Sequence, residues 1–457
     1  MGDRSAAINF YNTAVASAND KTYPENLSHS YQLFVSSCYA DPTFGVAFYQ
    51  TGNNNSELGH LPAAIACWRR ALQCEMTDLE KAKVLSNLSW RLHTTGEIDE
   101  AVPLAFEATR LDPTLSHAWL NLALLHETMD DSEKAVEFAR KAFDLDPTDS
   151  MMEMALSFAL MFNRQFAEGL RHFEIRFKYK LHNFLSYPQP KWNGEPDKTV
   201  FLVADQGLGD TLSYARFVEA AAKRARYLHI CIQPSLMRLF SHAFMHLPNI
   251  NLLPLPSQFP PADAWSTFVS LPYALGLTDD EIRNTPQIEV PVFSLPKTWK
   301  VPDRKLHIGI AWRGSTLNEI NKDRSIPVTQ FLDLYKVPGI QLYSLQVDDN
   351  RNQLHDQGCA ALIKDLAGYV SDVCDTVSLL KELDLVITCE SALGHICAAA
   401  NKECWIPYSY AGRDYRIGLT GDDPIWTPKH RFFRQGKDQD WAPVFEKMGA
   451  ALRERLK

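Results

Sequence analysis

Apolar and small positions recur every 34 residues in the first part of the chain. Leu88 falls on Leu122, and the motif Leu111-Asp112-Pro113 falls on Leu145-Asp146-Pro147. The small residues that match are Ala101 with Ala135, Ala105 with Ala139, and Ala108 with Ala142. Small residues let two helices approach closely, apolar residues at helical spacing bury their shared face, and Asp-Pro ends the second helix. The pattern predicts stacked helix pairs.

This period and its small residues resemble the tetratricopeptide repeat. Arrays of this kind form a curved solenoid whose concave face commonly receives a peptide or a neighbouring domain. Alternatively, the array braces the rest of the molecule or makes a dimer. Residues 1–44 are helical in composition but out of register, so we expect an irregular helical cap there and repeats over 45–183.

After Tyr179 the pattern changes to short apolar runs that alternate with helical segments. A first series contains TVFLVA, YLHICIQ and STFVSLP, and a second contains LHIGIAWRG, IQLYSLQ, LDLVITC and ECWIPYS. Such alternation predicts parallel sheets covered by helices on both faces. We expect two α/β domains, over 184–300 and 301–457, with a ligand cleft where the carboxyl ends of their strands face each other.

Composition limits the classes of partner and the cellular location that we expect for the chain. A net charge of -9 argues against a protein that binds nucleic acid or anionic membranes through clustered cations. Nine scattered cysteines without a Cys-x-x-Cys pair favour reduced thiols and a cytoplasmic location. No apolar run approaches the roughly 20 residues that span a bilayer, so we expect no transmembrane segment.

The stretch VADQGLGDTLSYARF joins an apolar run to a helical segment through a Gly-x-Gly turn. Gly207 and Gly209 let the backbone approach a ligand closely, and a helix beginning near Asp210 directs amide groups toward the same place. Asp210 is either the N-cap of that helix or a general base facing the cleft. The Lys-Ser/Thr pair of a phosphate-binding P-loop is absent.

A similar strand-turn-helix stretch, DLVITCESALGHICAAA, lies in the second half. Ser391 can cap a helix whose first turn includes Gly394 and His395, so that free amides, a hydroxyl and an imidazole converge where a diphosphate would fit. Alternatively, His395 is an ordinary helix histidine and Glu390 is a solvated acid at a strand end.

The stretch IAWRGSTLNEINKDRSIP places Trp312, Gly314 and Ser315 at a strand end, ahead of Lys322 and Arg324. An aromatic ring beside glycine and a hydroxyl, followed by cations, can hold a nucleobase or a phosphate. The alternative is a surface loop with ordinary charges. Because no carboxylate pair is expected at a strand end and no Cys/His cluster has zinc spacing, we expect no metal site.

Several strings occur together and in a fixed order: YPQPKWNGEP, DQGLGDTLSYARF, FVSLPYALG, GIAWRGS, DRSIP, LDLVITCESALGHICAAANKECWI and HRFFRQ. From about Leu58 to the C-terminus the chain resembles bacterial tetratricopeptide-repeat glycosyltransferases, which are related to lipopolysaccharide heptosyltransferases and, in architecture, to O-linked N-acetylglucosamine transferases. The resemblance implies a helical solenoid followed by a GT-B fold of two Rossmann-like domains, with the donor nucleotide mainly on the second.

The resemblance also implies roles for individual residues. Asp210 aligns with the catalytic base, and Gln206, Gly207 and Gly209 with the acceptor-side loop. The nucleotide-sugar site would comprise Trp312, Gly314, Ser315, Arg324, Glu390, Ser391, Gly394 and His395. Glu390 stands where the family usually has aspartate, and its extra methylene would move a carboxylate that normally touches the donor sugar or backbone.

Together these patterns predict a metal-independent inverting glycosyltransferase that needs no cofactor. It would move a sugar from a nucleotide-sugar donor to a hydroxyl of a glycan or protein, with the repeats recruiting an acceptor or partner. The sugar is left open among hexose, heptose and N-acetylhexosamine, and a homo-oligomer is compatible with the sequence. The alternative is a catalytically degenerate repeat scaffold that binds proteins, with nucleotide binding left open.

Overall fold

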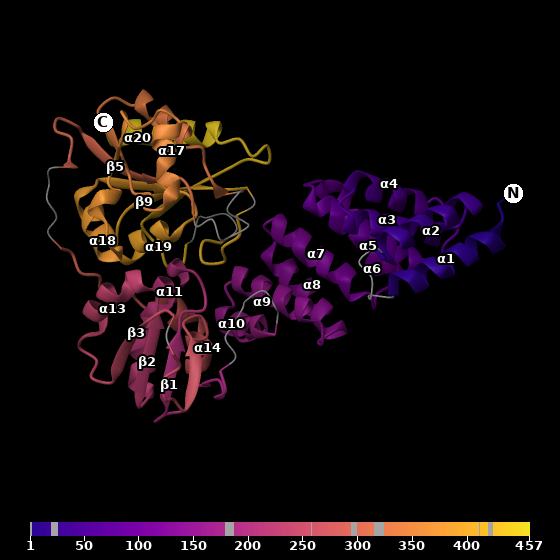
Figure 1. The fold of residues 1–457 in the computed structure, drawn as a ribbon, viewed down its shortest axis with the longest axis horizontal. Coiled ribbons are helices and arrows are strands. Elements are labelled where there is room, and N and C mark those ends of the chain that lie inside the picture. Colours follow the sequence, from indigo (N-terminus) through magenta and orange to yellow (C-terminus); the bar gives the residue numbers. More distant parts are fainter. Residues whose placement is uncertain are drawn as a thin grey trace. The chain divides into compact units, whose positions relative to one another are not determined.

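The computed structural model describes residues 2–19, 26–178, 187–256, 258–293, 299–314, 324–410, 412–418 and 424–457. The chain divides into two compact units, Met1–Asn163 and Arg164–Lys457. Figure 1 shows the first unit as helices and the second as two sheets with surrounding helices.

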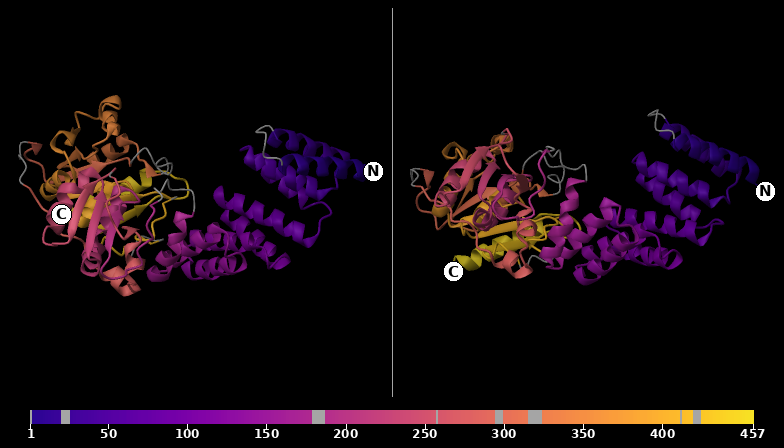
Figure 2. Two further views of the ribbon diagram at one scale, coloured as in Figure 1. Left: turned by 60° about the horizontal axis from the view of Figure 1, so that its bottom comes forward. Right: turned by 90° about the horizontal axis from the view of Figure 1, so that it is seen from below.

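The first unit is a series of helices in which each one packs against the next (Figure 2). The helices are α1 Arg4–Asn19, α2 Asn26–Ala40, α3 Gly45–Glu57, α4 Leu61–Ala71, α5 Asp78–Thr94, α6 Ile98–Leu111, α7 Ser116–Thr128, α8 Ser132–Leu145 and α9 Ser150–Phe162. The repeated alanines that the sequence assigns to helix contacts are buried, including Ala101, Ala105 and Ala139 at 0% exposure. The predicted helical repeats are confirmed.

Local sequence explains where these helices begin and end. Thr77 and Glu80 form a capping box at the start of α5, in which each side chain satisfies a backbone amide of the other. Helices α6 and α8 both end in a Leu-Asp pair, because Asp112 and Asp146 leave the helical conformation ahead of a proline. The Leu-Asp-Pro motif therefore sets the 34-residue period.

The first sheet of the second unit is parallel, with strand order β3-β2-β1-β4. Its strands are β1 Thr199–Val203, β2 Tyr227–Ile232, β3 Ile250–Pro254 and β4 Ala264–Thr267, and its helices are α11 Leu208–Tyr214, α12 Val218–Arg224, α13 Met237–Phe244, α14 Leu271–Leu275 and α15 Asp279–Asn284. β1 is central and buried from Val200 to Val203, which accounts for its continuous apolar run. The sequence pattern missed β3, and β4 begins two residues before the predicted run STFVSLP.

The second sheet is also parallel, with strand order β10-β9-β8-β5-β6-β7. Its strands are β5 Leu306–Ala311, β6 Ile340–Ser344, β7 Ile363–Asp365, β8 Leu385–Thr388, β9 Cys404–Tyr408 and β10 His430–Arg434, and its helices are α17 Gln353–Asp356, α18 Val373–Glu382, α19 Ala392–Ala399 and α20 Ala442–Arg455. Ile308, Leu342 and Ile387 form part of a core with 0% exposure. The predicted α/β region with parallel sheets is confirmed, although β7 and β10 were not predicted as strands.

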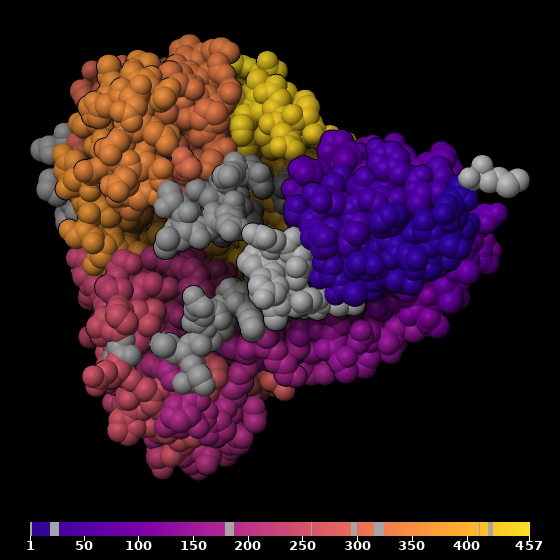
Figure 3. Space-filling model, turned by 45° about the vertical axis from the view of Figure 1, so that its right-hand side comes forward, coloured from indigo at the N-terminus to yellow at the C-terminus, as the bar shows by residue number. Residues whose placement is uncertain are grey.

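Both sheets are built outward from a central strand. In each sheet the strand that comes first in the sequence, β1 or β5, has later strands on both sides of it. This order creates one switch point between β1 and β4 and another between β5 and β8. Ligands of open α/β sheets bind outside the carboxyl ends of strands at such points. Figure 3 shows the parts of the second unit that carry the two sheets as two adjoining masses.

The C-terminal part of the predicted repeat region belongs to the second unit, which begins at Arg164. Helix α10, Phe166–Phe173, packs on α14 and α15, and the Ala167 amide donates a 2.6 Å hydrogen bond to Asp279 Oδ1. The short 3-10 segment Glu174–Phe177 follows it. The sequence places these residues within 45–183, so the domain limits of 1–44, 45–183, 184–300 and 301–457 stay predictions.

Candidate functional site between the two parallel sheets

Asp210 lies in the first turn of α11, just beyond the carboxyl end of β1. The helix begins at Leu208 and Gly207 occupies its N-cap position, so Asp210 does not cap it. Arg416 Nη1 instead donates a 2.8 Å hydrogen bond to Asp210 Oδ1. The Asp210 side chain is 32% exposed, and half-buried Gln206 precedes the helix. The capping interpretation is wrong for this side chain, which points to a residue of the other half.

Arg416 joins two carboxylates that come from different halves of the second unit. Its guanidinium donates hydrogen bonds to the Asp414 carboxylate, from Nε to Oδ1 at 2.9 Å and from Nη2 to Oδ2 at 2.8 Å, while Nη1 donates to Asp210. Burial acts to lower the pKa of Arg416, but the carboxylates of Asp414 and Asp210 raise it well above its ordinary value. A permanent cation therefore lies next to the candidate base.

His395 connects the first turn of α19 to α11, and the two helices pack against each other. Its Nδ1 shares a 2.8 Å hydrogen bond with Ser213 Oγ. Gly209 lies directly against the imidazole, because a Cβ there would be 3.1 Å from His395 Cγ and closer still to Cδ2. Gly209 is therefore needed for the close approach of the two helix starts, rather than for an unusual backbone angle.

The pKa of His395 gives a prediction for stability. Burial, reinforced by the charge of Arg416, lowers the pKa to about 4 against the opposing effect of Asp210 and Asp414. The unfolded chain, with an imidazole pKa near 6.5, therefore binds the proton first as pH falls. We expect the contribution of neutral His395 to the free energy of unfolding to be complete above about pH 6.5. It should be lost as pH falls toward 4, and the loss should reach about 2 kcal/mol at pH 5.

Denaturant unfolding at pH 7 and pH 5 measures this effect. His395→Gln should flatten the decline relative to the parent protein. His430→Gln is a second variant for comparison, because burial also lowers the pKa of His430, to about 3, and its loss should flatten the decline as well. Equal declines in the parent and in His395→Gln would mean that His395 titrates normally in the folded chain.

The loop between β8 and α19 holds the next predicted residues. Ser391 occupies the N-cap position of α19, but its hydroxyl pairs with Thr388 Oγ1 at 3.0 Å and makes no capping bond. The expected side-chain cap is therefore absent, and the first-turn amides of α19 are not used by it. Gly394 is buried in that turn, where a Cβ would lie 3.4 Å from Ile406 Cδ1.

Glu390 is held by the segment that follows β9. Its Oε2 accepts a 3.0 Å hydrogen bond from the Ser409 amide, and a Cβ at Gly412 would lie 2.7 Å from its Oε1. Burial raises the pKa of Glu390, while the hydrogen bonds from Ser409 oppose that rise. Glu390 is therefore a positioned carboxylate that ties two loops together, in contrast to the solvated acid considered from the sequence.

Trp312 lies inside the protein. It has 0% exposure within the core of the second sheet, and its indole Nε1 donates a 3.0 Å hydrogen bond to Gln353 Oε1. Gly314 is buried at the same strand end, and Ser315 lies outside the described residues. Trp312 thus packs in the core at the end of β5 and presents no ring surface to a nucleobase.

Arg324 carries its charge toward the same loop as Glu390 and His395. Its guanidinium lowers the pKa of each of these two residues, although its effect is smaller than that of burial and of the nearer polar groups. Its Nε is buried without a hydrogen-bond partner among the described residues. This placement is compatible with a cation that meets a ligand phosphate.

Further residues, which the sequence patterns did not predict, complete the site. Asp414 and Arg416 follow β9 at its carboxyl end, and between them Tyr415 shares a hydrogen bond between hydroxyls with Tyr214 of α11. Applying the strand-end rule to β9 as well as to β1, β5 and β8 would have drawn attention to them. In the described ranges no group of three or more His, Cys, Asp or Glu residues has the arrangement of a metal site.

Comparisons with known proteins concern the repeats. Residues 116–149, which contain α7 and α8, match the family model described as Tetratricopeptide repeat. No curated protein matches the chain. Among solved structures, MamA from Desulfovibrio magneticus RS-1 is 17% identical, covering 40% of this chain and 99% of that one with a TM-score of 0.33.

Two further solved structures give similar values. Pseudomonas aeruginosa PilF is 18% identical, covering 39% of this chain and 78% of its own with a TM-score of 0.34. YrrB, described as a TPR protein with an unusual peptide-binding site, is 14% identical, covering 38% of this chain and 86% of its own with a TM-score of 0.31. Among the helices that the structure describes, none is both long and apolar enough to cross a membrane.

Proposed function

We propose that the second unit is an inverting glycosyltransferase that uses a nucleotide-sugar donor and a hydroxyl acceptor. The observation that carries this proposal is the 2.8 Å contact between Asp210, at the end of β1, and Arg416, beyond the end of β9. It brings a candidate base to a cation and to the first turn of α19, the kind of helix end that binds anions. The sequence resemblance to GT-B glycosyltransferases assigns the base and the diphosphate motif to the same two regions.

In the proposed reaction Asp210 accepts the proton of the acceptor hydroxyl. The acceptor oxygen then forms a bond to the anomeric carbon of the donor, from the face opposite the diphosphate. The bond between that carbon and the diphosphate oxygen breaks, and the nucleoside diphosphate leaves with the electron pair. Arg324, Arg416 and the α19 amides are the groups that would stabilise its charge.

The test begins with donor binding. We expect one nucleotide sugar from a panel that varies the base and the sugar to raise the melting temperature, because a ligand that binds only the folded state stabilises it. The matching nucleoside diphosphate should also stabilise the protein, and Arg324→Gln should reduce both shifts. If no nucleotide or nucleotide sugar changes the melting temperature, the donor site is not present.

Transfer is expected to continue in EDTA. The proposed leaving-group contacts are fixed amides and guanidinium groups, which need no divalent ion to balance the diphosphate. The measurement is the rate of diphosphate release with EDTA and with added magnesium or manganese. A rate that disappears on chelation and returns with either metal would mean that a cation binds the diphosphate.

A second candidate function rests on the match to the tetratricopeptide-repeat family at residues 116–149. Repeats of this kind present surfaces for peptides and proteins, so the chain would act as a scaffold whose second unit is catalytically degenerate. A scaffold would bind a protein or peptide partner but would release no diphosphate from any nucleotide sugar. The two functions are therefore separated by turnover, not by partner binding.

A further inference from the structure

A pocket of about 190 Å³ lies beside the carboxyl end of β4, and neither Asp210 nor Arg416 lines it. Its walls include Trp265 and Thr267 of β4, Tyr273 of α14, and Lys191, which pairs with β4 as an isolated bridge. This position is next to the switch point between β1 and β4, where open α/β sheets bind ligands. The pocket is therefore in a favourable place for a ligand.

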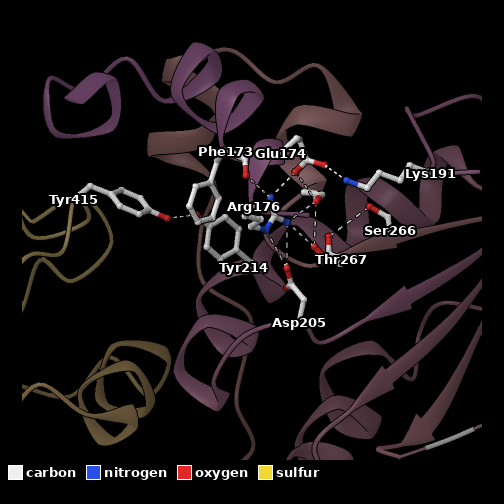
Figure 4. A network of polar contacts seen from close by, with 10 residues as sticks. Phe173, Glu174, Arg176, Lys191, Asp205, Tyr214, Ser266, Thr267 and Tyr415 are labelled. Atoms are coloured by element: carbon white, nitrogen blue, oxygen red, sulfur yellow. Dashed lines mark hydrogen bonds and ion pairs between the residues drawn. The ribbon is translucent and has the colours of Figure 1, made fainter. Parts of the chain in front are cut away.

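Three residues of the pocket wall, Glu174, Thr267 and Ser270, belong to a buried network of polar contacts (Figure 4). The network is centred on Arg176, whose side chain is 1% exposed. Arg176 donates to Glu174 Oε1 at 2.6 Å, to Asp205 Oδ2 at 3.1 Å and to Thr267 Oγ1 at 2.9 Å. Ser270 adds a 2.7 Å hydrogen bond to the same Glu174 oxygen. These bonds hold the Glu174 carboxylate and the hydroxyls in fixed positions at the pocket wall.

The charges around the pocket balance. Arg176 and Lys191 are opposed by Glu174 and Asp205, and Lys191 Nζ lies 3.1 Å from Glu174 Oε2. The same ammonium lies 3.1 Å from the centroid of the Phe177 ring, so the chain supplies its own cation to the aromatic face. A cationic ligand would compete with Lys191, and an anionic one would face Glu174.

We propose that this pocket binds one neutral sugar residue. Tyr273, which is 41% exposed, offers aromatic surface against which the C–H groups of a sugar ring can pack, and Trp265, which is 8% exposed, adds a small part of its ring to the wall. Fixed carboxylate and hydroxyl oxygens line the same pocket and can meet the hydroxyl groups of the sugar. Neutral, polyhydroxylated and partly apolar chemistry matches this lining better than any charged ligand. The inference goes beyond the proposed function, because it holds for a binding protein as well as for a transferase.

The test uses the full chain without any nucleotide. Glucose, galactose, mannose and N-acetylglucosamine are titrated at millimolar concentrations while tryptophan fluorescence and binding heat are followed. We expect saturable binding of at least one of them. Tyr273→Ala should weaken it by about three- to tenfold, the effect of one lost aromatic contact. The Tyr273 side chain is 41% exposed, so its removal should leave the fold intact.

Lys191→Gln is the second variant, because its side chain is 35% exposed and its loss changes the charge beside Glu174. Tyr39→Ala, which removes a tyrosine that is 83% exposed in the first unit, is the matched control and should bind like the parent. The proposal is overturned if none of the four sugars binds, or if inorganic phosphate or tetramethylammonium binds in their place. It is also overturned if Tyr273→Ala and Lys191→Gln have melting temperatures that show them to be folded and both bind the sugar as the parent does.

Discussion

Asp210→Asn is expected to slow sugar transfer by about 100-fold or more, the usual contribution of a positioned base. The amide keeps the shape of the side chain but cannot accept a proton. Because this side chain is 32% exposed and Arg416 retains its hydrogen bonds to Asp414, the melting temperature should change little. The measurements are diphosphate release, with the nucleotide sugar that protects the protein as donor, and thermal unfolding.

Asp414→Asn is the matched control, since it also removes one carboxylate from Arg416 but leaves the Asp210 carboxylate at the end of β1. We expect a smaller loss of rate and a larger loss of stability from it, because the Asp414 side chain is the more buried of the two, at 19% exposure. Equal losses of rate in both variants would assign the effect to the position of Arg416. An Asp210→Asn protein with the parental rate would remove Asp210 from the chemistry.

Gly209→Ala is expected to destabilise the protein by about 1–3 kcal/mol, as overpacking of a filled site does. The new methyl group would overlap the His395 ring, at 3.1 Å from its Cγ. The ring cannot move freely, since its Nδ1 is bonded to Ser213. The measurement is the free energy of unfolding in denaturant, with donor binding followed by thermal shift, and both should fall together.

Gly207→Ala provides the comparison at the neighbouring glycine. A Cβ there would meet only Asp210 Oδ2, at 3.6 Å, and the φ of -60° suits any residue. We expect a change within about 0.5 kcal/mol, as for a surface substitution without strain. If Gly209→Ala were equally silent, α11 and α19 would not depend on this contact, and His395 would have room that the structure does not give it.

Patterns that repeat along the chain could be predicted from the sequence. The 34-residue period located the Leu-Asp-Pro ends of α6 and α8, because each helix pair must bury the same small and apolar face. The continuous apolar runs located β1, β5, β8 and β9, because strands covered on both faces have no polar alternation. β3 escaped notice because it is partly exposed and its run contains prolines.

Individual side-chain partners could not be predicted in this way. Trp312 looked like a ligand contact because it follows a strand, but its direction depends on the pleat and on Gln353, which lies 41 residues further along. Arg416 belongs to a loop without periodic pattern, and its bond to Asp210 spans 206 residues of sequence. Long-range ion pairs of this kind depend on how two sheets meet, which a local pattern does not contain.

The structure of the two helix starts could be predicted from the sequence only in part. The sequence correctly predicted a helix after Ser391 and another around Asp210, because a polar or glycine turn follows an apolar run in both places. It misjudged their caps, since Ser391 bonds to Thr388 and Gly207 occupies the other N-cap position. The first-turn amides of α19 that the Ser391 side chain does not cap are what an anionic ligand would use.

The most direct test of the proposed function is the release of nucleoside diphosphate from nucleotide sugars. The full chain is mixed in EDTA with each member of the donor panel and with glycan and peptide acceptors, and products are identified by mass spectrometry. The account predicts diphosphate release from one donor, with the sugar attached to an acceptor hydroxyl, and loss of that product in Asp210→Asn. No release from any donor by a folded protein that binds the nucleotide would contradict it and leave a repeat scaffold.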